Sequence, residues 1–186
     1  MSTSVKLKNV RLSFPDLFTA VQYEGKGPFR YNASFLIEPG SDNHKAVEVA
    51  ITEAAAEKFN KKGASKIAEW KGNSNKFCYV SGDTKEYDGY QGMMVLSSHR
   101  KMEAGRPLII DGAKNPLSEA DGKPYAGCYV NASVDIYAQD GTNGGIRCGL
   151  KGVQFVRDGD AFSGSKVASP DEFDIEEGAD AEDDLA

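Results

Sequence analysis

The longest regular pattern in this sequence lies between residues 127 and 157, and it restricts the possible folds more than any other stretch. From Cys128 to Tyr137 apolar and polar residues alternate, which predicts a strand with one buried side and one solvent-facing side. Residues 139–145 are rich in Gly, Asn and Asp, which favour turns. Alternation resumes at residue 146 and changes phase at Lys151–Gly152, as in a β-bulge. The stretch therefore predicts a long antiparallel hairpin.

The first part of the chain predicts two further strands. Val5 to Phe14 alternates with a slip at Lys8–Asn9, so we expect a bulged strand that Pro15 ends. Residues 16–28 have the composition of a loop, and Phe29 to Glu38 alternates again. Between this second strand and the hairpin, the chain must hold the remaining elements.

A helix and several short strands occupy this middle region. Ser41 or Asp42 is expected to cap a helix that runs to about Asn60. A second helical segment at 64–70 ends on Trp70, which we expect to pack the helical region against the rest of the fold. The short strands are predicted at residues 77–81, 93–99 and 108–110.

These elements predict a mainly β (α+β) domain. Bulged strands, a helix inserted after the second strand and a closing hairpin are typical of a small closed barrel. Phe29, Phe35 and Phe155 share the phase of aliphatic neighbours and are expected in its core. We expect residues 1–157 to form this domain, 158–170 to be a flexible linker, and 171–186 to form a disordered acidic tail.

Charge is divided unevenly along the chain. The tail contains nine Asp and Glu residues and no Lys or Arg, which leaves 19 acidic against 22 basic residues elsewhere. A body of net charge +3 is thus joined to a polyanion, although the whole chain has a net charge of −6. Tethered at high effective concentration, such a tail is expected to compete with other anions for basic surface on the body.

The sequence offers little to a catalytic or metal-dependent function. It has two histidines, no Cys-x-x-Cys and no phosphate-binding glycine motif, so we expect no enzyme, no metal and no cofactor. Its three cysteines are expected to be buried thiols. No apolar run is long enough to span a membrane and no secretory signal is visible, so a cytoplasmic protein is expected.

Rings and cations on solvent-facing strands favour binding of single-stranded nucleic acid, whose unstacked bases stack on rings and whose phosphates pair with cations. For each tyrosine a place at the edge of the core, with its hydroxyl in water, remains the alternative. Six lysines between residues 58 and 76 indicate either a solvated helical surface or a basic flank for phosphates. The candidate binding residues are Arg30, Tyr79, Tyr90, Arg100, Lys101, Tyr129, Tyr137, Arg147 and Lys151.

Three blocks of the sequence resemble the single-stranded-DNA-binding proteins of tailed bacteriophages. They are VKLKNVRLSFPDLF, YNASFLIEPGSD, and PYAGCYVNASVDIYAQDG followed by GGIRCGLKGVQFVRDGDAF. The resemblance covers residues 5 to about 162 and implies an OB-fold barrel, a role in phage DNA replication and recombination in the bacterial host cell, and an acidic tail that meets replication proteins. Tails of this kind often end on an aromatic residue, whereas this one ends on Ala186. Its candidate contacts are Phe173, Asp183, Asp184 and Leu185.

Two functions remain open on the sequence. The first is a protein that coats single-stranded DNA without sequence preference and recruits phage or host replication proteins through its tail, with a homodimer compatible with the sequence. The second is a non-enzymatic phage adaptor whose barrel and tail bind only proteins. A small enzyme on the same barrel is disfavoured by the supply of histidines and motifs.

Overall fold

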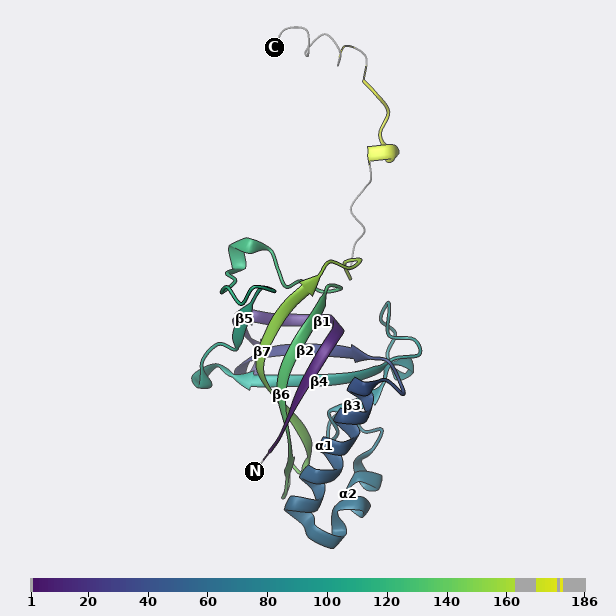
Figure 1. The fold of residues 1–186 in the computed structure, drawn as a ribbon, viewed down its shortest axis with the longest axis vertical. Coiled ribbons are helices and arrows are strands. Elements are labelled where there is room, and N and C mark those ends of the chain that lie inside the picture. Colours follow the sequence, from purple (N-terminus) through teal and green to yellow (C-terminus); the bar gives the residue numbers. More distant parts are fainter. Residues whose placement is uncertain (1, 163–169, 177, 179–186) are drawn as a thin grey trace.

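Five strands close into a barrel (Figure 1). The computed structural model describes residues 2–162, 170–176 and 178. The sheet has the order β3-β4-β2-β1-β6-β7-β5, and a parallel pairing of β4 with β7 completes the ring. The elements in chain order are β1 (Thr3–Tyr23), β2 (Lys26–Ile37), α1 (Asp42–Phe59), η1 (Asn60–Lys62), α2 (Gly63–Trp70), β3 (Tyr79–Ser81), η2 (Gly82–Thr84), β4 (Met94–Lys101), η3 (Met102–Ala104), β5 (Leu108–Ile110), η4 (Glu119–Asp121), β6 (Tyr129–Gln139), β7 (Gly145–Arg157) and η5 (Pro170–Glu172).

This topology confirms the predicted fold class, a mainly β, decorated OB-fold barrel. The helices α1 and α2 follow β2 and lie together beside the barrel (Figure 1). Ser41 caps α1 as predicted, because its hydroxyl accepts a hydrogen bond from the His44 amide. Trp70 is buried at the end of α2 in the same core cluster as the barrel residues and lies beside Gly144 of the β6–β7 turn, which confirms its packing role. Its ring also meets Phe59 of α1 edge to face.

β1 is longer than the sequence predicts. The expected bulge is confirmed as a register shift between Leu7 and Val10, but Pro15 does not end the strand and residues 16–28 are not a loop. Pro15 falls within the register shift between Ser13 and Asp16. Since its missing amide is needed by no ladder bond there, β1 continues to Tyr23 and pairs with an extended β2.

The closing hairpin is confirmed. β6 pairs with β7 along its whole length, and Ser133 opposes Gly152 while Val134 opposes Leu150. Lys151 is therefore the extra residue of the predicted bulge. The inward side of this hairpin supplies Val130, Val134 and other fully buried residues to the core.

Two of the three phenylalanines assigned to the core lie there. Phe35 is fully buried, and Phe155 is half-buried against the core. Phe29 is 46% exposed, so its assignment was wrong. It keeps the inward phase of Tyr31, but β1 and β2 run beyond the barrel at this point, and the core does not extend to cover it.

The ordered body continues past the end of β7. The Tyr125 hydroxyl donates to an Asp158 carboxylate oxygen at 2.8 Å, and the Phe162 amide donates to the Ala126 carbonyl at 3.0 Å. Residues 158–162 are thus bound to the barrel, and much of the segment after them lies outside the described residues. Within the described ranges, no helix has the length and apolar character that a membrane crossing requires.

Candidate nucleic-acid interface

The outer side of β2 and β4 carries a group of basic and polar side chains. Arg30 pairs with Lys101 and Asn32 pairs with His99 across these two strands. Tyr31 and Ala33, which alternate with Arg30 and Asn32 along β2, are buried. The four paired residues therefore share the outer side of the barrel. Two cations and a histidine thereby lie on one short stretch of surface.

β7 and β6 extend this group around the barrel. His99 opposes Gly149 where β4 meets β7, and two residues earlier Arg147 pairs with Tyr137 of β6. Burial raises the pKa of Tyr137, and the nearby charges of Arg147 and Arg30 partly oppose that rise. We call Arg30, Lys101 and Arg147, grouped around His99, the cationic row.

His99 is held neutral within the cationic row. Desolvation, followed by the charges of Arg30 and Arg147, lowers its pKa to about 4. Asn32 donates its amide nitrogen to Asp16 at 3.0 Å, which turns its amide oxygen toward His99 Nδ1 at 2.7 Å. His99 therefore donates through Nδ1 and leaves Nε2 able to take up a proton when an anion arrives.

Arg147 is fixed in place without losing its charge. Its guanidinium donates to the carbonyl oxygens of Asn75 at 2.6 Å and Asn143 at 3.1 Å. Both partners are neutral, so the full positive charge is available to a phosphate. Such an anchored guanidinium loses little conformational entropy on binding.

An exposed aromatic pair lies farther along the same side of the molecule. Phe14 is 54% exposed and Tyr87 is 48% exposed, and their ring centroids are 4.8 Å apart in an edge-to-face contact. Tyr90 lies behind them, 5.2 Å from Tyr87. A cavity of about 350 Å³ opens at these rings, with Phe162 on its wall. Phe14 has φ of 45°, rare for an aromatic residue, at a bend of β1.

The aromatic pair and the cationic row belong to one continuous surface. Ser13, next to Phe14, pairs with Ser34 on the outer side of β2. Leu36 on the same side packs against Tyr90, and the strand then runs through Ser34 and Asn32 to Arg30. The surface has rings at one end, cations at the other and small polar residues between them. These groups match the unstacked bases and the phosphates of a single-stranded nucleic acid.

Comparison with known proteins identifies the family. The family model of the single-stranded-DNA-binding protein of Enterobacter phage Enc34 matches residues 3–186. The chain belongs to this family. A relative, protein p50 of Acyrthosiphon pisum secondary endosymbiont phage 1, is 47% identical over 172 residues, which cover 91% of this chain and 92% of p50.

Solved structures agree with the Enc34 family assignment. The single-stranded DNA-binding protein from bacteriophage Enc34 has a TM-score of 0.66 at 25% identity, over 92% of this chain and 90% of that one. The same protein in complex with single-stranded DNA gives 0.66 at 22% identity, over 86% and 89%. The single-stranded DNA-binding protein of bacteriophage T7, at 10% identity, gives 0.53 over 90% and 98%. The resemblance read from the sequence is confirmed.

Three candidate residues have structural roles in this Enc34-family protein. Tyr79 and Tyr90 are 3% and 2% exposed, so the expectation that they offer ring faces was wrong. Their hydroxyls pair with His44 Nδ1 and with Ser13 Oγ, both at 2.6 Å, and burial raises the pKa of each. Arg100 donates to the carbonyls of three residues, which orders the turn after β4.

Two more candidates are already engaged with other side chains. The Arg157 guanidinium lies 3.7 Å from the centre of the Tyr129 ring and covers that face. The Lys151 ammonium is 3.2 Å from an Asp135 carboxylate oxygen and donates to the Ser4 hydroxyl at 2.9 Å. Neither the Tyr129 ring nor the Lys151 ammonium group is therefore as available to a nucleic acid as the sequence pattern suggests.

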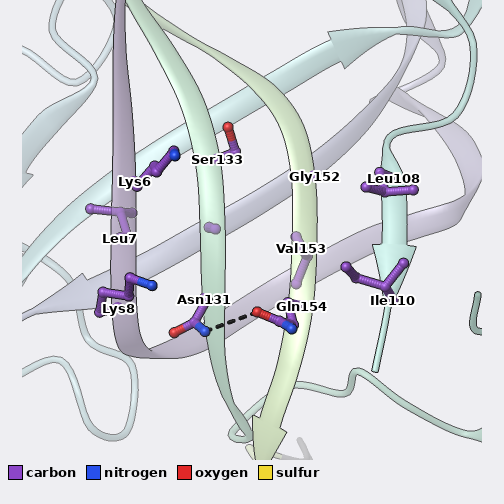
Figure 2. A pocket seen from close by; sticks show the side chains of 11 residues that line it. Lys6, Leu7, Lys8, Leu108, Ile110, Asn131, Ser133, Gly152, Val153 and Gln154 are labelled. Atoms are coloured by element: carbon purple, nitrogen blue, oxygen red, sulfur yellow. Dashed lines mark hydrogen bonds between the residues drawn. The ribbon is translucent and has the colours of Figure 1, made fainter. Parts of the chain in front are cut away.

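A separate groove lies on the outer side of the β6–β7 hairpin around Asn131 and Gln154 (Figure 2). It has a volume of about 200 Å³, and Leu108 and Ile110 of β5 form one wall while Lys6 and Lys8 of β1 form the other. Asn131 donates to Gln154 at 3.0 Å between them. The groove is largely apolar and holds none of the residues of the cationic row.

The glycine-flanked loop from residue 82 to 92 predicts that Tyr87 is presented to solvent, but Tyr87 and its partner Phe14 are not among the candidate residues. The candidates also omit the rings of the part of β1 and β2 that runs beyond the barrel, which we call the β1–β2 extension. Tyr23 is 71% exposed at the tip of this extension, on which Phe29 also lies. For Tyr23 and Phe29 the signal was the ring itself, on strands whose full length the sequence pattern did not reveal. Of the tail candidates, Phe173 is 70% exposed, while Asp183, Asp184 and Leu185 lie outside the described residues. Within the described ranges, no three His, Cys, Asp or Glu side chains gather for a metal ion.

Proposed function

We propose that this protein binds single-stranded DNA without sequence preference along the outer side of β2 and β4. The observation that carries the proposal is the continuous surface from the aromatic pair to the cationic row. Membership of the Enc34 family supports it, as does the complex of the Enc34 protein with single-stranded DNA.

The rings supply the preference for unpaired DNA. Phe14 and Tyr87 present open ring surface beside a cavity large enough to admit a planar base. Each base–aromatic stack contributes about 1–3 kcal/mol whatever the base, because every base has a π-face. Duplex DNA keeps its bases stacked inside and cannot use the rings, so its binding would rest on phosphate contacts alone.

The cationic row supplies the phosphate contacts. Arg30, Lys101 and Arg147 come from three different strands and face the same surface. Each phosphate that they neutralise releases counterions and adds about −0.7 to the salt slope for a single strand. The ring of Tyr23, at the tip of the β1–β2 extension, lies beyond Arg30 and lengthens the surface for a further base.

The acidic tail has a regulatory role in this proposal. Its nine carboxylates compete with DNA for the cationic row until a strand displaces them. Once displaced, the tail is free to bind phage or host replication proteins through Phe173, Leu185 and the adjoining Asp183 and Asp184. We place this activity in the cytoplasm of the bacterial host, where phage DNA is replicated, and assign the protein no enzymatic step.

A binding titration tests the proposal. Labelled oligothymidine and a duplex of equal length are titrated by fluorescence anisotropy at two salt concentrations. Preferential binding of the single strand, weakened by salt, is expected. A protein adaptor without DNA affinity would give no anisotropy change with either, even after removal of residues 171–186, and that result would overturn the proposal.

A further inference from the structure

A turn flanked by lysines lies directly beside the cationic row. Residues 71–76 (Lys-Gly-Asn-Ser-Asn-Lys) connect α2 to the chain leading into β3. The Arg147 guanidinium donates to the Asn75 carbonyl at 2.6 Å, and the Ile146 amide donates to the Lys76 carbonyl at 2.8 Å. We call residues 71–76 the lysine turn. It is bound to the strand that carries Arg147, where the β6–β7 hairpin lies beside the helices (Figure 1).

The lysine turn is polar, basic and exposed. Lys71 and the four residues after it are exposed, and Lys76 is half-buried. The turn holds no acidic residue, and within the described ranges neither lysine forms an ion pair. Glu69, the acid nearest in sequence, lies 3.8 Å from Lys66. The two ammonium groups are therefore available to an anion.

The backbone of the lysine turn is ordered before any ligand binds. The Asn73 carbonyl accepts from the amides of Lys76 at 3.0 Å and Phe77 at 2.8 Å, and its side-chain oxygen accepts from the Asn75 amide at 3.0 Å. A turn held in this way loses little entropy on binding. Lys58, another lysine of the helical region, is not part of this turn. It lies in the last turn of α1, where its charge offsets the helix dipole.

We propose that a bound single strand continues from Arg147 onto the lysine turn, where Lys71 and Lys76 each hold a phosphate. The inference rests on the proposed function and extends its site from the barrel to the helical insert. A polyanion with regularly repeated phosphates is the ligand that fits, since the Arg147 guanidinium of the proposed site is hydrogen-bonded to Asn75, which lies between the two lysines in the turn. Exposed Ser74 and Asn75 offer hydrogen bonds to the sugar-phosphate backbone.

Oligothymidines of two lengths test the inference in the full-length protein. Lengths of about four and about sixteen nucleotides bracket the site sizes of OB folds. We expect Lys71→Gln/Lys76→Gln to bind the short strand like the wild type. With the long strand, the salt slope should fall in magnitude by about 1.4, and the affinity should fall roughly 25-fold at 0.1 M salt, for two lost contacts.

A matched variant separates this site from a general loss of charge. Lys6→Gln/Lys8→Gln removes two lysines from the groove of Figure 2 and should leave both affinities near those of the wild type. An equal loss in both double variants, or a Lys71→Gln/Lys76→Gln variant that binds the long strand like the wild type, would overturn the inference while leaving the proposed function intact. A wild type that binds neither strand would overturn both. Thermal melting confirms that the variants are folded.

Discussion

At the scale of single residues, the exposed rings should matter for binding and the buried ones for stability. Phe14→Ala and Tyr87→Ala each remove a ring that is about half exposed. We expect each to weaken oligothymidine binding by about 1–3 kcal/mol and to leave the melting temperature within a few degrees of the wild type. Anisotropy titrations and thermal melts of the two variants check this. Unchanged affinity in the Phe14→Ala/Tyr87→Ala double variant would place the bases elsewhere.

Tyr90 provides the opposite case at the same location. Tyr90→Phe keeps the ring but leaves the buried Ser13 hydroxyl without its partner at 2.6 Å. The free energy of unfolding should fall by about 1–3 kcal/mol, while the affinity for oligothymidine stays that of the wild type. Denaturant unfolding monitored by fluorescence, with titrations in parallel, separates the two effects. A variant with full stability and weakened binding would return Tyr90 to the list of base-stacking residues.

We expect His99 to make the binding of DNA depend on pH. Its pKa of about 4 lies below the ordinary value of 6.5, so the unfolded chain binds more protons between these values and stability falls as pH drops through that window. A phosphate bound beside the ring should raise the pKa of His99, so DNA binding should take up a proton. The affinity for oligothymidine should therefore rise between pH 7.5 and 5.5, by at most about tenfold per pH unit. His99→Gln should lose this part of the pH dependence, and an identical profile for both proteins would contradict the assignment.

At the scale of elements, the loop from residue 82 to 92 positions Tyr87 over β1. A Cβ on Gly82 would overlap the Tyr90 carbonyl oxygen and lie 2.8 Å from that of Met93. Gly82→Ala should therefore displace the loop and weaken both stability and oligothymidine binding. Gly112→Ala is the control, because its Cβ would meet only the Phe155 carbonyl oxygen at 3.9 Å. Melting and anisotropy of both variants check the prediction, and a fully active Gly82→Ala protein would show that the loop's position is unimportant.

The elements also show what the sequence can and cannot predict. Alternation located the β6–β7 hairpin and its bulge at Lys151, because one side faces a core that spans its whole length. The same rule failed for Phe29, since alternation reports phase and not where the barrel ends. The prediction that Pro15 ends the first strand was wrong, because the register shift that accommodates Pro15 depends on the partner strand. Of the candidate residues, Arg30, Tyr137 and Arg147 were assigned to outward phases with which the strand pairings agree. Lys101 was chosen as a cation near the end of a predicted strand, and the burial of Tyr79 and Tyr90 depends on tertiary contacts that the pattern does not reveal.

At the scale of the whole molecule, the charge of the tail opposes the charge of the body. Deleting residues 171–186 removes nine carboxylates and leaves a body of net charge +3. If the tail occupies the cationic row in the free protein, the truncated protein should bind oligothymidine several-fold more tightly at low salt. The advantage should shrink as salt rises, since screening weakens tail and DNA contacts alike. Titrations of both proteins at 0.05 and 0.3 M salt, on the order of the range in which single-strand contacts are lost, measure it.

A neutral tail of the same length distinguishes charge from bulk. Replacing the nine Asp and Glu residues by Asn and Gln keeps a tethered chain of the same length but removes its negative charge. Competition by charge predicts that this protein binds like the truncated one, whereas steric cover predicts that it binds like the wild type. Equal low-salt affinity of all three proteins would mean that the tail does not occupy the cationic row.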